Sequence, residues 1–393
     1  MKKVAIVAAQ RSAIGSFGGS LKDTNLAKFG ADLVRLTLEK IKLDPAEVNE
    51  VIFGNVLQAG LGQNIARQIA VHAGIPKETP AFVVNKVCGS GLKSVNLAAN
   101  SILVGENDVV VAGGIEFMSQ APYLSKTNRF GSKLGNVELV DSILSDGLTD
   151  AFENYHMGIT AENIAKKYTI SREEADAFAA SSQQKAEAAI KAGRFKDEII
   201  PLEVKAGRET KVFDTDEFPR FGTTSESLAK LRPAFEKEGV STAGNSSGIN
   251  DGAAVIVLMS DDKAKELGIP VLAYIEAKSS CGLDHTLMGL GPITASKKLL
   301  NTSNIDIKDI DLFELNEAFA TQSIAVLRDL EVDPAKVNVN GGAISLGHPI
   351  GASGARILVS LVHELKKQDK NLGLASLCIG GGQGISMLIS NNK

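Results

Sequence analysis

Cysteine is scarce in this chain. The 393 residues include three cysteines, Cys88, Cys281 and Cys378, which lie far apart in the sequence. An odd number of widely separated cysteines does not indicate a disulfide framework. No Cys-x-x-Cys pair and no Cys/His ligand spacing occurs, so a zinc site is not expected either. Each cysteine is therefore expected to be a free thiol.

The chain also lacks a basic excess and a long apolar run. Its formal net charge is −4, which argues against a nucleic-acid partner because no basic face is available to neutralise phosphates. The first ten residues hold two lysines and a short apolar run that stops at Arg11, too short for a signal peptide or a membrane span. These features predict a soluble, cytoplasmic protein with no membrane partner.

Glycine, by contrast, is abundant. The 38 glycines cluster at expected junctions between strands and helices, as in a large α/β protein with ligand sites at its turns. Apolar runs at 4–9, 51–56, 80–84 and 107–113 alternate with helical periodicity at 25–41, at 64–73 and after Cys88. This β-α-β-α-β rhythm predicts a mostly parallel sheet with helices on both faces.

The rhythm changes after residue 120 and restarts at residue 271. The intervening segment is charged and irregular, with one helix predicted behind the capping-box pattern that begins at Ser171. The last part repeats the order of the first, with strand ends at Asn55 and Asn316. We therefore predict three parts: an N-terminal half of residues 1–120 and 246–270, an inserted loop domain of residues 121–245, and a C-terminal half of residues 271–393.

The first glycine-flanked turn holds Cys88, between an apolar run and a predicted helix. Gly89 and Gly91 leave room there for a substrate to approach. A thiol at a helix start lies beside unpaired N–H groups and the positive end of the helix dipole, which both favour the thiolate. From this turn alone, a buried cysteine that packs as a small hydrophobic residue is an equally good interpretation.

The corresponding turn of the second half holds His348, in a span rich in small residues. Pro349 restricts the backbone at this histidine. If a pseudo-twofold axis relates the halves, the two turns meet near the centre, where His348 could take the proton of a thiol. Taken alone, a loop histidine bonded to a carbonyl is an equally good interpretation.

A third glycine-rich segment, Cys378-Ile379-Gly380-Gly381-Gly382-Gln383-Gly384, follows a predicted strand. A nucleotide loop is not favoured, because residues 385–389 predict another strand where a dinucleotide-binding turn needs a helix, and the P-loop lysine is absent. Bare glycine N–H groups are better suited to hold an oxyanion, with Cys378 at the mouth of the same site.

Four separated motifs together resemble the signature stretches of the thiolase family. They are Asn85-Lys86-Val87-Cys88-Gly89-Ser90-Gly91, Asn316-Glu317-Ala318-Phe319, Asn340-Gly341-Gly342-Ala343 through Gly347-His348-Pro349 to Gly351, and Cys378-Ile379-Gly380-Gly381-Gly382. They follow the family's order and spacing, and the resemblance covers the whole chain. Within the family, Tyr155-His156-Met157-Gly158 and Met288-Gly289-Leu290-Gly291-Pro292 are most similar to the biosynthetic type.

This resemblance implies both a fold and a reaction. The fold is α/β with duplicated β-α-β-α-β-α-β-β halves, in five layers α-β-α-β-α, and an inserted loop domain. The reaction is the reversible Claisen condensation of two acetyl-CoA to acetoacetyl-CoA and CoA. Cys88 would be the nucleophile, His348 its proton acceptor and an oxyanion donor, and Cys378 the acid/base at the acetyl methyl group. Asn316 would hold an oxyanion-hole water, and the Gly380 N–H would serve the tetrahedral intermediate.

The resemblance also implies a binding set for coenzyme A, without a resident cofactor or metal. The implied pantetheine tunnel is lined by Leu148, His156, Met157, Phe235, Met288, Ala318 and Phe319. Ser247 would meet the pantetheine amides, and Arg220 would face the nucleotide phosphates. The chain is expected to associate as a dimer or a dimer of dimers, the latter through the segment 125–141.

Three alternatives stay open at this point. A 3-ketoacyl-CoA thiolase of broader chain length is the nearest, although Met288 and the pair His156-Met157 favour a short acyl pocket. A β-ketoacyl synthase would have no use for Cys378. A non-catalytic CoA-binding relative is the third, and the intact cysteines and His348 argue against it.

Overall fold

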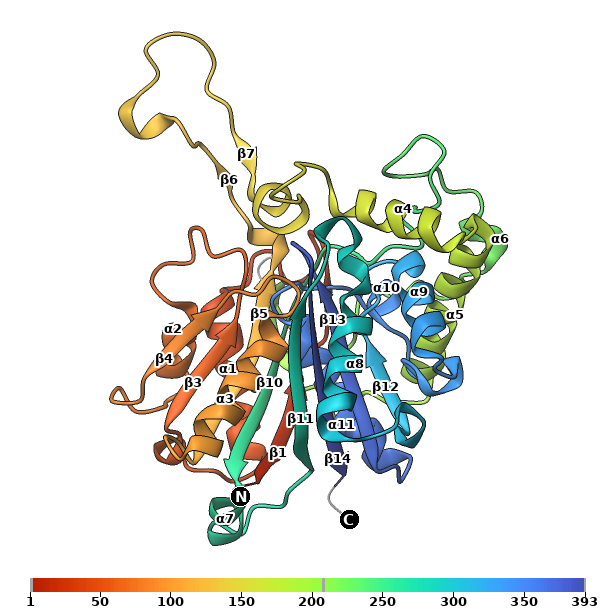
Figure 1. The fold of residues 1–393 in the computed structure, drawn as a ribbon. Helices are drawn as coiled ribbons and strands as arrows, with labels where there is room; N and C mark the ends of the chain where they lie inside the picture. Colours follow the sequence, from red (N-terminus) through yellow and green to blue (C-terminus); the bar gives the residue numbers. More distant parts are fainter. Residues whose placement is uncertain (1–2, 207–208, 392–393) are drawn as a thin grey trace.

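The computed structural model of the chain describes residues 3–206 and 209–391. One large sheet forms the centre of the molecule. Its main strands are β1 (Val4–Arg11), β3 (Glu50–Gly54), β4 (Ala81–Val84), β5 (Val109–Phe117), β10 (Asn250–Ser260), β11 (Ala273–Gly282), β12 (Leu312–Leu315), β13 (Leu372–Ile379) and β14 (Gln383–Asn391). They lie in the order β12-β13-β14-β11-β1-β10-β5-β3-β4, and the short β2 (Gly15–Ser16) pairs with β10 (Figure 1).

This strand order contains the same unit twice. In each half the first strand lies beside the last one, which lies beside the second-last, which lies beside the second. The resulting orders are β1-β10-β5-β3 in the first half and β11-β14-β13-β12 in the second. In the first half β4 follows β3, and in the second half a single parallel bridge from Val337 to Phe313 takes the corresponding place. The halves join where Ala5 and Ile6 of β1 pair with β11. The predicted duplication is confirmed by this topology.

The prediction of a mostly parallel sheet was wrong. Parallel pairing is limited to β3 with β4, β3 with β5, and β12 with β13 among the described strands. The closing strand of each half, β10 or β14, runs antiparallel to both neighbours. The turn at 380–382 is too short for a crossover connection, so β13 and β14 form a hairpin.

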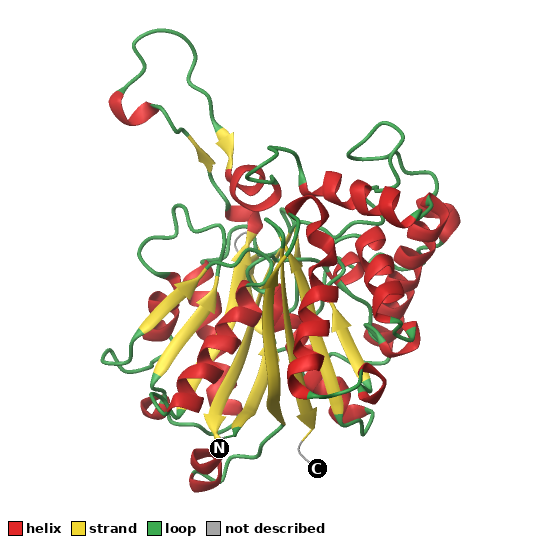
Figure 2. Cartoon of the chain, in the orientation of Figure 1, coloured by secondary structure: helices red, strands yellow, loops and turns green. Residues whose placement is uncertain are grey.

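Helices lie outside and between the two parts of the sheet, which gives five layers. Figure 2 shows helices in front of the strands and behind them. The outer helices are α1 (Leu26–Lys40) and α2 (Ile65–His72) over the first half, and α8 (Gly291–Ser303) and α9 (Ala320–Leu330) over the second. Between the two parts of the sheet lie α3 (Ser90–Val104) and α11 (Ser353–Lys367). Strand residues alternate between layers: Val7 contacts the outer core and Ile6 the middle one.

The inserted segment packs on this body. It contains α4 (Met157–Tyr168), α5 (Arg172–Lys191), the hairpin β8 (Leu202–Ala206) and β9 (Glu209–Phe213), and α6 (Ser225–Leu228). Its buried anchor is Arg11 of β1, whose Nε lies 2.6 Å from Glu198 and whose Nη1 lies 2.7 Å from Asp216. Ser171 caps α5 as predicted, whereas α4 was missed because the His156 ring acts as its cap.

An arm projects from the same segment. Its base is formed by β6 (Tyr123–Leu124) and β7 (Val140–Asp141), and its tip extends away from the body (Figure 1). The arm carries two fully accessible apolar side chains, Phe130 (94% exposed) and Leu134 (97%). In the part of the chain that the structure describes, no helix is long and apolar enough to cross a bilayer.

Candidate active site

The starts of α3 and α11 touch each other through glycines. A Cβ on Gly91 would lie 2.7 Å from the backbone N of Ala355, and a Cβ on Gly354 would lie 2.3 Å from that of Leu92. No side chain fits at either position, so only glycine allows the two helix starts to come so close. The contact is reciprocal, as a pseudo-twofold axis requires, and it places the Cys88 turn beside the His348 turn.

The Cys88 turn is held in a constrained conformation. Val87 has a φ of +46°, which is costly for a β-branched residue. Two side chains hold the turn: Asn85 Oδ1 accepts a hydrogen bond from Val87 N (3.0 Å), and Ser90 Oγ donates to Val87 O (2.6 Å). Val87 immediately precedes Cys88, so this constrained turn fixes the backbone position from which the Cys88 side chain extends.

Burial dominates the electrostatics of the Cys88 thiol. It raises the pKa of Cys88 to about 11, and the N–H groups of Gly380 and of Cys88 itself only partly offset this. The negative charge of Glu116 acts in the same direction as burial. Burial therefore opposes the helix start, which favours the thiolate, and a neighbouring base is needed to take the proton if Cys88 is to react.

His348 is placed to be such a base. Its imidazole is buried, and Nδ1 lies 2.6 Å from Ser353 Oγ. Its backbone N donates to Asn250 Oδ1 (2.9 Å), while Nε2 has no hydrogen-bond partner among the described residues. Burial, with the nearby charge of Arg356, lowers the pKa of His348 to about 3. The imidazole is therefore neutral and can accept a proton at neutral pH.

Cys378 lies at the end of an apolar cluster that contains most of the predicted tunnel residues. The cluster comprises Met157, Ala161, Met288, Ala318, Phe319 and Cys378, with Phe235 packed against it. His156 stacks on Phe235 with ring centroids 4.8 Å apart. Burial raises the pKa of the Cys378 thiol, and the neighbouring Cys88 adds to this effect. The structure thus brings the two cysteines and the apolar cluster together around Gly380.

Asn316 is buried without hydrogen bonds from its side chain. The residue is fully enclosed, and neither Oδ1 nor Nδ2 has a partner among the described residues. Buried amides are nearly always hydrogen-bonded, so an unpaired one calls for a ligand or a water. Asn55, its counterpart in the first half, instead donates from Nδ2 to Glu116 Oε1 (2.9 Å). The two equivalent asparagines therefore have different tasks.

The other predicted binding residues are spread around this centre. Leu148 packs with Ile350 beside the His348 turn and is not part of the apolar cluster. Ser247 is held by its backbone N, which donates to Ala318 O (3.0 Å). Arg220 is exposed on the inserted segment.

One important residue was missed from the sequence. Glu116, at the end of β5, is buried and accepts hydrogen bonds from Val56 N (3.0 Å), Leu57 N (3.1 Å) and Gly351 N (2.9 Å), besides the one from Asn55. It ties the turn after β3 to the turn that follows His348. The available signal was a carboxylate directly after an apolar strand, which must be satisfied if it is buried.

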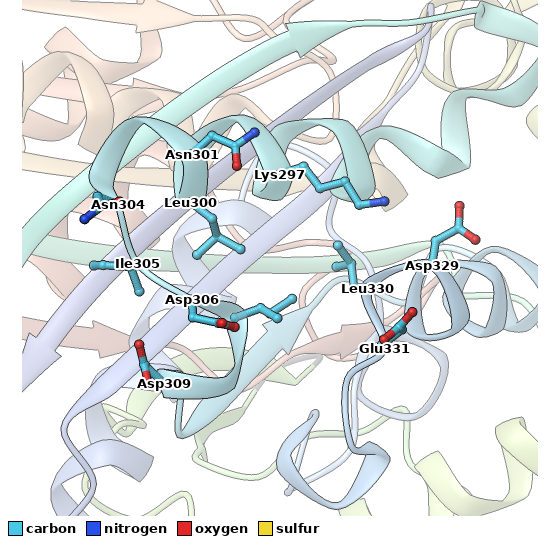
Figure 3. Close-up of a pocket in the computed structure, with 11 residues that line it drawn as sticks. Lys297, Leu300, Asn301, Asn304, Ile305, Asp306, Asp309, Asp329, Leu330 and Glu331 are labelled. Carbon is cyan, nitrogen blue, oxygen red and sulfur yellow. The ribbon is translucent and has the colours of Figure 1, made fainter.

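Other features of the surface do not belong to this site. A hollow of about 930 Å³ between α8 and α9 is lined by Lys297, Asp306, Asp329 and Glu331, among others, and by none of the predicted site residues (Figure 3). Within residues 3–206 and 209–391, no three His, Cys, Asp or Glu side chains are grouped as ligands of a metal. The thiol-containing centre is therefore the best candidate for chemistry.

Comparison with known families gives two matches that together span nearly the whole chain. Residues 4–262 match the thiolase N-terminal domain, and residues 269–391 match the thiolase C-terminal domain. Among curated proteins, an acetyl-CoA acetyltransferase of Pseudomonas aeruginosa is 56% identical over 393 residues, which is 100% of both chains. One from Allochromatium vinosum is 54% identical over 99% of both chains.

Solved structures agree in fold. The crystal structure of the Bacillus anthracis acetyl-CoA acetyltransferase superposes with a TM-score of 0.98 at 45% identity, covering 100% of this chain and 99% of that one. Human mitochondrial 3-ketoacyl-CoA thiolase in complex with CoA gives a TM-score of 0.96, also at 45% identity, covering 100% and 98%. With both domains matched and full-length relatives above half identity, this chain belongs to the thiolase family.

Proposed function

We propose that the chain is an acetyl-CoA C-acetyltransferase, which condenses two acetyl-CoA to acetoacetyl-CoA and CoA and runs the reverse reaction. The observation that carries the proposal is that Cys88 and Cys378, from the two halves, are neighbours beside one apolar cluster, with the Cys88 turn next to the turn that holds His348. It is supported by the full-length relatives, of which those from P. aeruginosa and A. vinosum carry this name.

In the first half-reaction, the Cys88 sulfur attacks the carbonyl carbon of acetyl-CoA. The S–C bond to the enzyme forms, the C–S bond to CoA breaks, and the leaving CoA sulfur takes the proton of Cys378, which leaves Cys378 as a thiolate. The proton of Cys88 is held on His348 Nε2. Because the pKa of Cys88 is about 11 and that of His348 about 3, we infer that the proton leaves as the new bond forms. The N–H groups of Cys88 and Gly380 receive the oxyanion.

In the second half-reaction, Cys378 acts on the second acetyl-CoA. Its thiolate removes a proton from the methyl group, and the resulting carbanion attacks the acetyl group on Cys88. The C–C bond forms, the Cys88–acetyl bond breaks, and the Cys88 sulfur takes back the proton held on His348, so both enzyme thiols are restored. The enolate oxygen would be stabilised by His348 and by a water on Asn316, whose buried amide is unpaired. Removing one such donor typically costs roughly 100- to 1000-fold in rate.

The apolar cluster is the proposed wall of the pantetheine tunnel. His156, Phe235 and Phe319 form a chain of ring contacts at its side, and Met288 is buried within it. Ser247 would meet the pantetheine amides, and the exposed Arg220 would bind the nucleotide phosphates. No resident cofactor is needed, since coenzyme A enters and leaves as part of the substrates.

A second candidate is a 3-ketoacyl-CoA thiolase that accepts longer chains. It is supported by the TM-score of 0.96 and 45% identity to the human mitochondrial 3-ketoacyl-CoA thiolase, which equals the identity to the B. anthracis enzyme. The two candidates share their mechanism and differ in the space beyond the reacting carbonyl.

We further propose that copies of the chain associate. The edge strand β4 has its outer side unpaired and carries Phe82, which is 37% exposed, so a second copy can extend the sheet there. The apolar tip of the arm, with Phe130 and Leu134, would join two such dimers. A cytoplasmic location is proposed because the three cysteines are free and a thiol nucleophile needs a reducing compartment.

The decisive experiment is a chain-length series in the thiolysis direction. Purified protein is given CoA and 3-ketoacyl-CoA of increasing length, with acetoacetyl-CoA as reference, and kcat/KM is measured for each. A maximum at acetoacetyl-CoA is expected. A maximum at a longer chain would favour the second candidate, and absence of all thiolysis would leave only a non-catalytic CoA-binding protein.

A further inference from the structure

A single serine decides which nitrogen of His348 carries the proton. Ser353 Oγ lies 3.0 Å from the carbonyl of Pro349 and 2.6 Å from His348 Nδ1. Ser353 Oγ donates its single hydroxyl hydrogen to Pro349 O, the carbonyl four residues earlier in the chain. Toward His348 the same oxygen can then only accept. We therefore assign Nδ1 as the donor, with the hydrogen on that nitrogen.

The other nitrogen is left as a proton acceptor. In a neutral imidazole with hydrogen on Nδ1, Nε2 holds the lone pair. Nε2 of His348 is buried and has no partner among the described residues. It is also the only nitrogen of this ring that remains available to substrate or to Cys88.

We propose that Ser353 is a positioning residue that fixes His348 in the Nδ1–H tautomer, so that Nε2 is ready to take the proton of Cys88. This rests on the proposed function, in which Cys88 is the nucleophile. With the opposite tautomer, Nε2 would carry a hydrogen and could not accept another, and the thiol would have no base.

The surroundings keep this arrangement rigid. Ser353 is the first residue of α11 and is 1% exposed. The backbone of His348 is fixed by Asn250, and a Cβ on Gly347 would lie 2.5 Å from the amide carbon of that asparagine. Two contacts thus position His348: Asn250 binds its backbone N, and Ser353 binds Nδ1 of its ring. A substitution of Ser353 removes only the contact to the ring.

The pseudo-twofold axis supports the assignment independently. The reciprocal contact of Gly91 and Gly354 makes Ser90 the counterpart of Ser353. Ser90 Oγ donates to Val87 O (2.6 Å) and accepts from Lys86 N (2.8 Å). Both serine hydroxyls thus donate to a backbone carbonyl of the preceding turn and accept a hydrogen bond from an N–H group. In the second half, that N–H belongs to the catalytic imidazole.

The charged and titratable groups that act on this pair are few. Arg356 of α11 acts on His348, and Glu314 of β12 is ion-paired with Arg356 (3.3 Å). Glu116 of β5 acts on Cys88, which in turn acts on Cys378. None of them is hydrogen-bonded to Ser353, so its replacement by alanine leaves these charges in place.

The test compares Ser353→Ala and Ser353→Thr with a matched control, Ser360→Ala. Ser360 is another buried serine of α11, bonded to Glu198 and not to His348. Acetylation of Cys88 by acetyl-CoA is followed by rapid quenching and mass spectrometry between pH 7 and pH 10. In parallel, alkylation of Cys88 by iodoacetamide is followed over the same range, an arm that needs no acetyl-CoA.

We expect Ser353→Ala to slow the acetylation of Cys88 by roughly 100-fold at pH 7, the low end of the range for loss of a general base. Alkylation, which depends only on the thiolate already present, should stay within about threefold of the parent protein. The acetylation deficit should shrink toward pH 10, because a thiol that ionises by itself needs no base. Ser353→Thr should stay within about threefold of the parent protein and Ser360→Ala should match it.

Three results would overturn the assignment. They are an unchanged acetylation rate in Ser353→Ala, a deficit that is equal at pH 7 and pH 10, as a merely structural defect would give, and a folded Ser353→Thr that is as slow as the alanine variant. If the parent protein is alkylated but never acetylated, the proposed function fails, whereas a parent protein that is acetylated no faster than Ser353→Ala overturns only the assignment of Ser353.

Discussion

Cys88 should be an un-ionised thiol in the free protein and should therefore react more slowly than an ordinary cysteine. The perturbation is pH, and the reagent is iodoacetamide, which reacts with the thiolate only. Burial raises the pKa of Cys88 from 9.0 to about 11. At any pH below 9 the thiolate fraction should therefore be roughly 100-fold smaller than that of an ordinary thiol, since each pKa unit is a factor of ten.

The sign of the pH dependence follows from the same shift. A thiol with a raised pKa gains thiolate only as the pH rises, so the alkylation rate should increase about tenfold per pH unit and show no plateau up to pH 9. The pH profile of the alkylation rate should show no additional step from His348, because the pKa of His348 is lowered to about 3 and the imidazole stays neutral throughout this range. Rates at each cysteine are read from peptide masses after proteolysis, with a short peptide around Cys88 as the reference thiol.

A plateau below pH 8, with a rate at neutral pH above that of the reference peptide, would refute this reasoning. It would mean that Cys88 and His348 form a thiolate–imidazolium pair at rest. Proton transfer would then precede the attack on acetyl-CoA, and the dipole at the start of α3 would outweigh burial.

Further predictions concern separate parts of the proposed mechanism. Cys378→Ser should still acetylate Cys88 but lose proton exchange at the acetyl methyl group by at least about 100-fold; unimpaired exchange, measured by NMR in deuterated water, would remove this residue from the base role. Asn316→Ala should lower kcat by roughly 100-fold with little change in KM, and an equal rise in KM would indicate a binding role instead. Met288→Ala should raise kcat/KM for longer 3-ketoacyl-CoA relative to acetoacetyl-CoA, and an unchanged ratio would exclude this wall as a length limit. Phe130→Ser, which changes only the exposed arm tip, should lower the oligomeric state in sedimentation without changing turnover; an unchanged state would exclude the arm as a contact.

Much of the fold was predictable because the repeated pattern of strands and turns appears in the sequence itself. The apolar runs that end at Asn55 and Asn316 marked β3 and β12, and the glycines after Cys88 marked the start of α3. Strand direction was not predictable in the same way. An apolar run shows that a strand is buried but not which neighbour it pairs with, so the antiparallel closing strands were missed.

The candidate site was harder to predict from the sequence where a residue acts through a partner that is distant in the chain. Glu116 and Gly351 are 235 residues apart and are joined by one hydrogen bond, and no local pattern announces it. The raised pKa of Cys88 has the same origin, because it depends on how many groups surround the sulfur in the fold. The four sequence motifs predicted which residues form the candidate site. The packing around the Cys88 thiol, which the motifs do not show, determines its protonation.

The duplication offers a physical account of how one unit came to hold different chemistry. Each half supplies an asparagine after its second strand and a serine at the start of its central helix. In the first half both are used for structure: Asn55 binds Glu116, and Ser90 holds the strained backbone before Cys88. In the second half the same positions face the site, where the Asn316 amide is unpaired and Ser353 contacts an imidazole. The first half uses these positions to hold the Cys88 turn, which under the proposed function leaves the counterpart positions of the second half to act on the substrate, and exchanging Ser353 should therefore affect the rate more than the stability.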